Sequence, residues 1–243
     1  MDDCPKCGGA GFVLKAANEG DGQAVYSVGG PAVLTACPVC NGTDRRQEYL
    51  RNVSGLTDEE YDRDFAGYWS QKHAGKTLRD GRLVGVTGFE ILDMARNVLT
   101  ENGWLTLAGS NGNGKSFLLT AIVNEAVRAG RLAVYIRMAD LLEHLRQAFK
   151  PGAEVDYDQL WALICRAEVL AIDEAEKYNA TTWAEEKVMS LAEDRNRRWR
   201  ECVTLWSVND VADVPSYLKS RMTCGRFSFV VMTGNDIRPG LRR

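Results

Sequence analysis

The sequence lacks any long hydrophobic run, and no apolar segment approaches the roughly 20 residues that a membrane-spanning helix needs. Its first residues, Met-Asp-Asp-Cys, contain neither the basic segment nor the apolar stretch of a secretory signal. An excess of one charge is also missing, because 30 basic residues face 33 acidic residues. We therefore expect a cytoplasmic protein with no membrane partner. The net charge of −3 neither indicates nor excludes nucleic acid.

The cysteines are informative through their number and their spacing. Seven cysteines, an odd number, in a reducing compartment do not predict a disulfide framework. Four of them form two Cys-Pro-x-Cys pairs, each followed by a glycine-containing turn, and two such pairs supply the four thiolates that Zn²⁺ prefers: Cys4, Cys7, Cys37 and Cys40. Strand-like runs lie between the pairs at residues 11–14, 24–28 and 32–36. Residues 1–50 are thus predicted to form a small zinc-ribbon-like module. Iron in place of zinc, or two unrelated reduced pairs, are the alternatives.

Residues 51–83 are rich in charge and predict a helical connector. Thr57 with Glu60 three residues later is typical of a capping box at the start of a helix. The basic residues just after the second cysteine pair suit either a solvated face or nucleic acid: Arg45, Arg46 and Arg51.

A glycine-rich octet, Gly109-Ser-Asn-Gly-Asn-Gly-Lys-Ser116, follows the apolar run at residues 104–108 and precedes a helical pattern. Glycines let backbone N–H groups approach phosphate oxygens closely, and a helix N-terminus adds its positive end. We predict that Lys115 neutralises the β and γ phosphates of ATP and that the Ser116 hydroxyl binds Mg²⁺. The predicted phosphate-binding residues are Gly109, Ser110, Asn111, Gly112, Asn113, Gly114, Lys115 and Ser116.

Two further strand ends carry polar residues. The run at residues 168–172, which is apolar from Val169 onward, ends in Asp173 and Glu174, and the run at 202–208 ends at Asn209. After a phosphate-binding loop, the first carboxylate is expected to hold Mg²⁺ and the second to polarise the attacking water. Asn209 is expected to contact that water or the γ-phosphate, with a turn-forming Asn-Asp pair as the alternative.

Helical patterns at residues 88–99, 115–129, 138–149, 157–167 and 182–199 alternate with strands near 104, 132, 169, 203 and 227. This βαβ succession predicts a parallel sheet between helical layers, an αβα sandwich of the P-loop NTPase class. The predicted organisation is therefore a cysteine module at 1–50, a connector at 51–83 and an ATPase domain at 84–243.

From about residue 84 onward the sequence resembles the AAA+ ATPases of the DnaC/IstB type, which are helicase loaders and transposon helper ATPases. Besides the two nucleotide motifs, the resemblance rests on Thr182-Trp-Ala-Glu-Glu186 and Ser216-Tyr-Leu-Lys-Ser-Arg-Met222. It implies that Asn209 is a sensor and that Arg221 is an arginine finger, with Arg226 as its rival. A finger that reaches the ATP of a neighbouring subunit implies a homo-oligomer.

The resemblance also points to single-stranded DNA. The helix at 138–149 occupies the position of a DNA-lining element, with three candidate phosphate contacts: His144, Arg146 and Lys150. A denser basic cluster fits either DNA or the C-terminus of a helix, where cations are favoured: Arg195, Arg197, Arg198 and Arg200. The chain is too short after Asn209 for the helical lid of many AAA+ proteins, and Arg238 is a candidate substitute for the lid's sensor arginine.

The resulting hypothesis is an ATP-dependent DNA replication protein, a helicase loader that hydrolyses ATP and engages a replicative helicase and single-stranded DNA. ATP, Mg²⁺ and Zn²⁺ are the expected cofactors. The alternatives are an IstB-type transposon helper ATPase and a zinc-dependent nucleotide-binding adaptor with negligible hydrolysis.

Overall fold

The computed structural model describes residues 12–16, 25–27, 30–37, 51–149, 157–234 and 236. Several residues with predicted roles lie outside these ranges, and their roles remain predictions: Cys4, Cys7, Cys40, Arg45, Arg46, Lys150 and Arg238. Cys37 is described and is buried directly after a strand.

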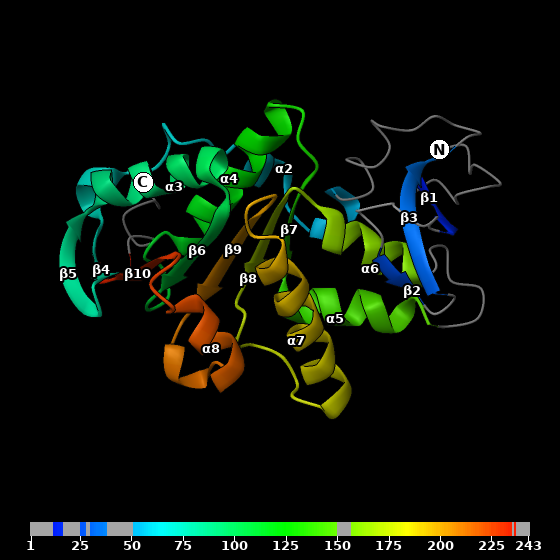
Figure 1. The fold of residues 1–243 in the computed structure, drawn as a ribbon. Helices are drawn as coiled ribbons and strands as arrows, with labels where there is room; N and C mark the ends of the chain where they lie inside the picture. The colour runs from blue at the N-terminus through cyan, green and yellow to red at the C-terminus, as the bar shows by residue number, and fades with distance from the viewer. Residues whose placement is uncertain are drawn as a thin grey trace.

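The described core is one seven-stranded sheet, in which five neighbouring strands are parallel and two at one edge are antiparallel (Figure 1). Its spatial order is β5 (Arg82–Thr87), β4 (Ala74–Arg79), β10 (Ser228–Met232), β6 (Gly103–Ala108), β9 (Val203–Val208), β8 (Val169–Asp173) and β7 (Ala133–Arg137). The five strands expected from the apolar runs are the parallel ones. Because β6 pairs with β9 and β10 rather than with β7, polar residues from distant parts of the chain meet at one edge.

Helices cover both faces of this sheet, as an αβα sandwich requires. One layer contains α3 (Gly88–Glu101) and α4 (Lys115–Arg128), with the one-turn helix α2 (Asp58–Tyr61) beside α4. The other contains α5 (Met138–Gln147), α6 (Tyr157–Arg166), α7 (Thr182–Arg197) and α8 (Ser216–Met222). Alternate strand residues serve the two layers: Trp104 packs with the second layer and Leu105 with the first. The predicted fold class is confirmed.

The segment predicted to be a helical connector contains both helix and strand, and its residues 51–54 are helical. The capping box at Thr57 is present, but α2 is only four residues long, and a short 3₁₀ helix (η1, Ser70–Lys72) leads into β4. The β4–β5 hairpin spans residue 84, the predicted start of the ATPase domain, and β4 pairs with β10 of the main sheet. Its turn is Asp80-Gly81, with positive φ at both residues, the geometry of the tightest hairpins. The division into domains stays a prediction.

A second, antiparallel sheet is built from β1 (Phe12–Ala16), β3 (Gly30–Ala36) and β2 (Val25–Ser27), in that spatial order. Its strands correspond to the three strand-like runs of the N-terminal sequence. This sheet lies against α6 (Figure 1). It is compatible with a ribbon-like module, and the metal centre itself stays a prediction.

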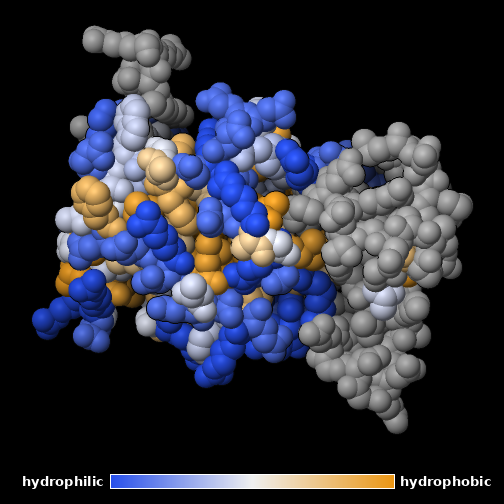
Figure 2. Space-filling view, turned by 90° about the horizontal axis from the view of Figure 1, so that it is seen from above, coloured by the Kyte–Doolittle hydropathy of each residue, from blue (hydrophilic) through white to orange (hydrophobic). Residues whose placement is uncertain are grey.

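The helices of the described ranges contain no segment long and apolar enough to cross a bilayer. On the face drawn in Figure 2, hydrophobic residues gather in patches among hydrophilic ones. This is the ordinary surface of a globular fold, in which much apolar area remains exposed.

Candidate functional site

The glycine-rich loop lies between the end of β6 at Ala108 and the start of α4 at Lys115. Gly109 and Gly114 have φ of 133° and 85°, a region that side chains disfavour. A Cβ on Gly109 would lie 2.4 Å from the Met232 carbonyl oxygen, and one on Gly114 would lie 2.4 Å from His73 Nε2. The loop thus keeps its backbone N–H groups at the helix N-terminus only because these positions are glycine.

Lys115 is folded over this loop. Its Nζ donates hydrogen bonds to the carbonyl oxygens of Gly109 (2.5 Å) and Ser110 (2.8 Å) and to Asn113 Oδ1 (3.3 Å). Asn113 in turn donates to the Met232 carbonyl at 3.2 Å, which ties the loop to β10. Burial lowers the pKa of Lys115, against the attraction of nearby carboxylates, chiefly Asp173. The ammonium is therefore held, partly desolvated, beside the phosphate cradle.

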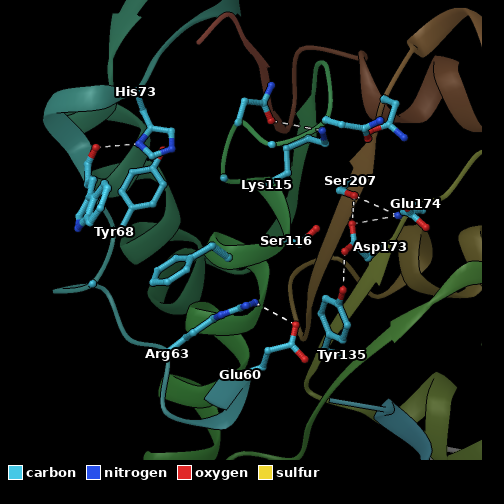
Figure 3. Close-up of a pocket in the computed structure, with 18 of the residues that line it drawn as sticks. Glu60, Arg63, Tyr68, His73, Lys115, Ser116, Tyr135, Asp173, Glu174 and Ser207 are labelled. Carbon is cyan, nitrogen blue, oxygen red and sulfur yellow. Dashed lines mark hydrogen bonds and ion pairs between the residues drawn. The ribbon is translucent and has the colours of Figure 1, made fainter. Parts of the chain in front are cut away.

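Asp173 ends β8 and is buried at 2% exposure. It accepts hydrogen bonds from the Tyr135 and Ser207 hydroxyls, on the flanking strands β7 and β9, and from the Glu174 N–H at 3.0 Å (Figure 3). Burial and the adjacent Asp173 charge raise the pKa of Tyr135, so this phenol stays a protonated donor. The two hydroxyls orient the carboxylate toward the cavity that Ser116 also lines.

Glu174 and Asn209 line the same cavity. Glu174 has a left-handed backbone, with φ of 52°, and its carboxylate forms an ion pair with Lys177 at 2.5 Å. The Asn209 N–H donates to Glu176 Oε1 at 3.0 Å. The structure therefore brings together the predicted phosphate loop, both acidic residues and the polar end of the third strand.

The cavity has a volume of about 400 Å³, and its opposite wall was not predicted from the sequence. This wall comes from α2 and from the segment that connects it to β4: Glu60, Arg63, Gly67, Tyr68, Trp69 and His73. Tyr68 and His73 are buried and stacked, with ring centroids 4.3 Å apart (Figure 3). Nothing in the spacing of these residues identifies them, because only the packing of the segment on α4 carries them to the cavity.

His73 has a defined hydrogen-bonding role. Its Nδ1 lies 2.8 Å from the Trp69 carbonyl oxygen, so Nδ1 carries the proton and Nε2 is an acceptor in the neutral ring. Burial lowers the pKa of His73, against the effect of this hydrogen bond, and favours the neutral ring. Among the described residues, His73 Nε2 and Tyr68 Oη are buried without a hydrogen-bond partner.

The remaining strand-end residues of the cavity are Arg137 and the two positioning hydroxyls, Tyr135 and Ser207. Arg137 is paired in register with Asp173 across β7 and β8. Sequence reasoning selected the last residues of β8 and β9 but passed over the end of β7. The same rule, that parallel strands deliver side chains at their carboxyl ends, applies to it.

The candidate finger residues lie away from this cavity. Arg221, on α8, donates to the Tyr217 carbonyl at 2.9 Å and pairs with Glu193 at 3.3 Å. Arg226 is exposed, and its guanidinium carbon lies 5.6 Å from the centre of the Trp199 ring. Neither residue lines the cavity described above, and the role of each stays a prediction.

The basic cluster at the end of α7 divides into two kinds of residue. Arg195 is fully buried and donates to Thr204 and to the backbone carbonyls of Cys165, Ala167 and Val203. Arg198 pairs with Asp194 at 2.7 Å. Arg197 and Arg200 are accessible to solvent. The buried Arg195 cannot contact DNA, because its hydrogen bonds go to groups inside the core.

The DNA candidates on α5 are at the surface. His144 is half-buried, and Arg146 is exposed with its guanidinium carbon 5.2 Å from the centre of the Trp183 ring. The predicted contact of this helix with single-stranded DNA stays a prediction.

Comparison with known families bears directly on this geometry. The family described as IstB-like ATP binding protein matches residues 76–205, from β4 to within β9. This chain is a member of the IstB-like ATP-binding family. The match contains the phosphate loop, Asp173 and Glu174. No curated protein matched the sequence.

Solved structures agree with the fold of this IstB-like protein. The DnaC helicase loader is 17% identical with a TM-score of 0.53, and the match covers 73% of this chain and 100% of that one. DnaI is 16% identical, with a TM-score of 0.52 and coverage of 74% and 96%. DnaA bound to AMPPCP and single-stranded DNA is 14% identical, with a TM-score of 0.56 and coverage of 73% and 51%. The chain thus spans about half the length of that DnaA.

The family match identifies an IstB-like ATP-binding protein, and the solved structures of DnaC and DnaI share its fold. In this chain the parallel strands follow the order β10-β6-β9-β8-β7, and the phosphate loop comes directly after β6.

Proposed function

We propose that this IstB-like ATPase is a DNA replication protein that hydrolyses ATP while it loads or remodels a replicative helicase on single-stranded DNA. The observation that carries the proposal is the single cavity in which the phosphate loop, Asp173, Glu174 and Asn209 meet. Its fold is similar to that of the DnaC helicase loader and of a DnaA bound to single-stranded DNA, which supports the replication setting.

The residues of the cavity fit Mg²⁺ and a triphosphate. Ser116 and Asp173 offer a hydroxyl and a carboxylate oxygen, the hard ligands that Mg²⁺ takes alongside phosphate oxygens and water. When bound, the ion neutralises charge on the β and γ phosphates. Lys115 exchanges its loop carbonyl partners for phosphate oxygens, and the N–H groups at the start of α4 hold the same phosphates. Glu174 orients the attacking water, and Asn209 holds that water or the γ-phosphate.

The stacked pair Tyr68 and His73 supplies the wall beyond the phosphates. Aromatic side chains of this kind suit a wall that packs against a nucleobase or a ribose. The segment from α2 to β4 would then respond to whether nucleotide is bound.

We further propose that Arg221 serves the ATP of a neighbouring subunit, which makes the active form an oligomer. Its partner Glu193 is half-exposed, so the guanidinium can exchange this ion pair for a phosphate at modest cost. Arg226 is the rival.

The N-terminal module is proposed to bind Zn²⁺ through Cys4, Cys7, Cys37 and Cys40 and to contact the helicase. Support comes from the doubled Cys-Pro-x-Cys spacing and from the sheet β1–β3, which ends beside Cys37. Metal analysis of the full chain should find one zinc per chain, and Cys4→Ser with Cys7→Ser should lose it. Iron, or no metal, would refute this part.

Phosphate release tests the proposal. The full chain is assayed with and without single-stranded DNA, beside Glu174→Gln and Arg221→Ala, while nucleotide binding is followed separately with a fluorescent ATP analogue. We expect DNA-stimulated turnover that both variants lose without losing nucleotide binding. Turnover that persists in Glu174→Gln would refute the assigned chemistry.

The family match itself favours a second function, that of a transposon helper ATPase of the IstB type. Such a protein would act on duplex DNA. Stimulation by duplex rather than single-stranded DNA, with no effect of a replicative helicase, would favour it. Nucleotide binding with no phosphate release under any of these conditions would favour the nucleotide-dependent adaptor.

A further inference from the structure

The turn that follows β8 contains two interactions between the same pair of residues. The Lys177 N–H donates to the Glu174 carbonyl oxygen at 2.8 Å, and Lys177 Nζ lies 2.5 Å from Glu174 Oε1. Both are local, three residues apart, so forming them orders little additional chain. They bring an ammonium group directly onto the carboxylate that lines the nucleotide cavity.

The backbone of Glu174 is fixed independently of the Lys177 side chain. The Glu174 N–H donates to Asp173 Oδ1 and to Ser207 Oγ, each at 3.0 Å, and its φ of 52° is held by this arrangement. The neighbouring carboxylate of Glu176 is engaged with the Asn209 N–H. A change in the Lys177 contact therefore moves the Glu174 side chain alone and leaves the rest of the site in place.

We propose that Lys177 is a positioning residue that restrains the Glu174 carboxylate and keeps the hydrolysis rate low. The ion pair holds Glu174 Oε1 on the Lys177 ammonium group, so the pair opens when the carboxylate turns to orient the attacking water. This inference rests on the role proposed above for Glu174. Half of the Lys177 side chain is exposed, so an anionic partner can reach it from solvent.

The size of the restraint is limited by this exposure. Solvent-exposed ion pairs contribute little free energy. The upper end of the range measured for such pairs corresponds to a change of about fivefold in an equilibrium constant or a rate. Salt screens such a pair, and the restraint weakens as ionic strength rises. Lys177 is therefore expected to tune the rate within this range.

The test compares Lys177→Ala, Lys177→Arg and the wild type at saturating Mg-ATP, with Lys76→Ala as the control. Lys76 is an exposed lysine of β4. We expect Lys177→Ala to raise kcat about two- to fivefold at low salt, with KM for ATP changed less than kcat. Lys177→Arg, which keeps the cation, and Lys76→Ala should resemble the wild type. The ratio of kcat between Lys177→Ala and wild type should fall toward one at high salt.

An unchanged or lower kcat in Lys177→Ala, with the melting temperature of the wild type, would overturn the inference. Failure of the proposed function is distinguished by Glu174→Gln. If that variant is inactive and Lys177→Ala is no faster than wild type, only the restraint is wrong. If Glu174→Gln hydrolyses ATP normally, the role of Glu174 is wrong as well. The double variant, Glu174→Gln with Lys177→Ala, should stay inactive, because the glutamine amide cannot act as a base even when Lys177 no longer restrains it.

Discussion

Replacing Tyr135 by Phe removes one hydroxyl and keeps the ring. That hydroxyl donates a hydrogen bond to Asp173, which is 2% exposed. Asp173 accepts two further hydrogen bonds, from the Ser207 hydroxyl and from the Glu174 N–H. A hydrogen bond to a charged group contributes about 1.5–3 kcal/mol, and the loss leaves a buried carboxylate less compensated. At about 2–4 °C per kcal/mol for a chain of this size, Tyr135→Phe should lower the melting temperature by about 3–12 °C.

Tyr68→Phe is the matched control, because it deletes the same atom from the same cavity. Tyr68 Oη is buried without a hydrogen-bond partner among the described residues, so its removal should leave stability unchanged or raise it slightly. Urea unfolding followed by circular dichroism, with thermal melting beside it, measures both variants without nucleotide. Equal losses in the two, or no loss in Tyr135→Phe, would refute the reasoning that separates a paired hydroxyl from an unpaired one.

Three further predictions concern single residues. Arg195→Ala should lower the free energy of unfolding in urea by more than about 3 kcal/mol, because buried carbonyl groups lose their donor and a cavity opens. The control Arg197→Ala, at an exposed position, should stay within about 0.5 kcal/mol of wild type. Similar values for the two variants would contradict the burial argument. Burial lowers the pKa of His73 below its ordinary 6.5, so unfolding takes up a proton below that pH and stability should fall as the pH drops from 7.5 to 5.5. His73→Gln should reduce this fall and His144→Gln should keep it, and an equal fall in both would count against the assignment. Gly114→Ala should weaken nucleotide binding at least tenfold in a fluorescence titration. The new Cβ would meet His73, and the alanine backbone would be strained by about 1–2 kcal/mol. An affinity equal to that of the wild type would show that the loop adapts.

The sheet shows where sequence patterns succeed and where they fail. Buried parallel strands read as continuous apolar runs, so β6, β8 and β9 were predictable, together with the polar residues at their ends. The β4–β5 hairpin was missed because its strands are half-exposed and charged, and its segment begins with a capping box. The Asp80-Gly81 turn was the available signal.

The sequence alone determined the chemistry of this protein: a glycine loop that only glycine can form, a lysine and a serine at the start of a helix, and acidic residues at the end of a buried strand. These are local features, since their residues are neighbours in the chain. Only the tertiary structure decided which groups face them. Three contacts join segments far apart in sequence: His73 against Gly114 of the glycine loop, the hydroxyls of Tyr135 and Ser207 on Asp173, and Arg195 on the Cys165 carbonyl. Such contacts depend on strand order and on the packing of α2 and α4, which no spacing of residues along the chain records.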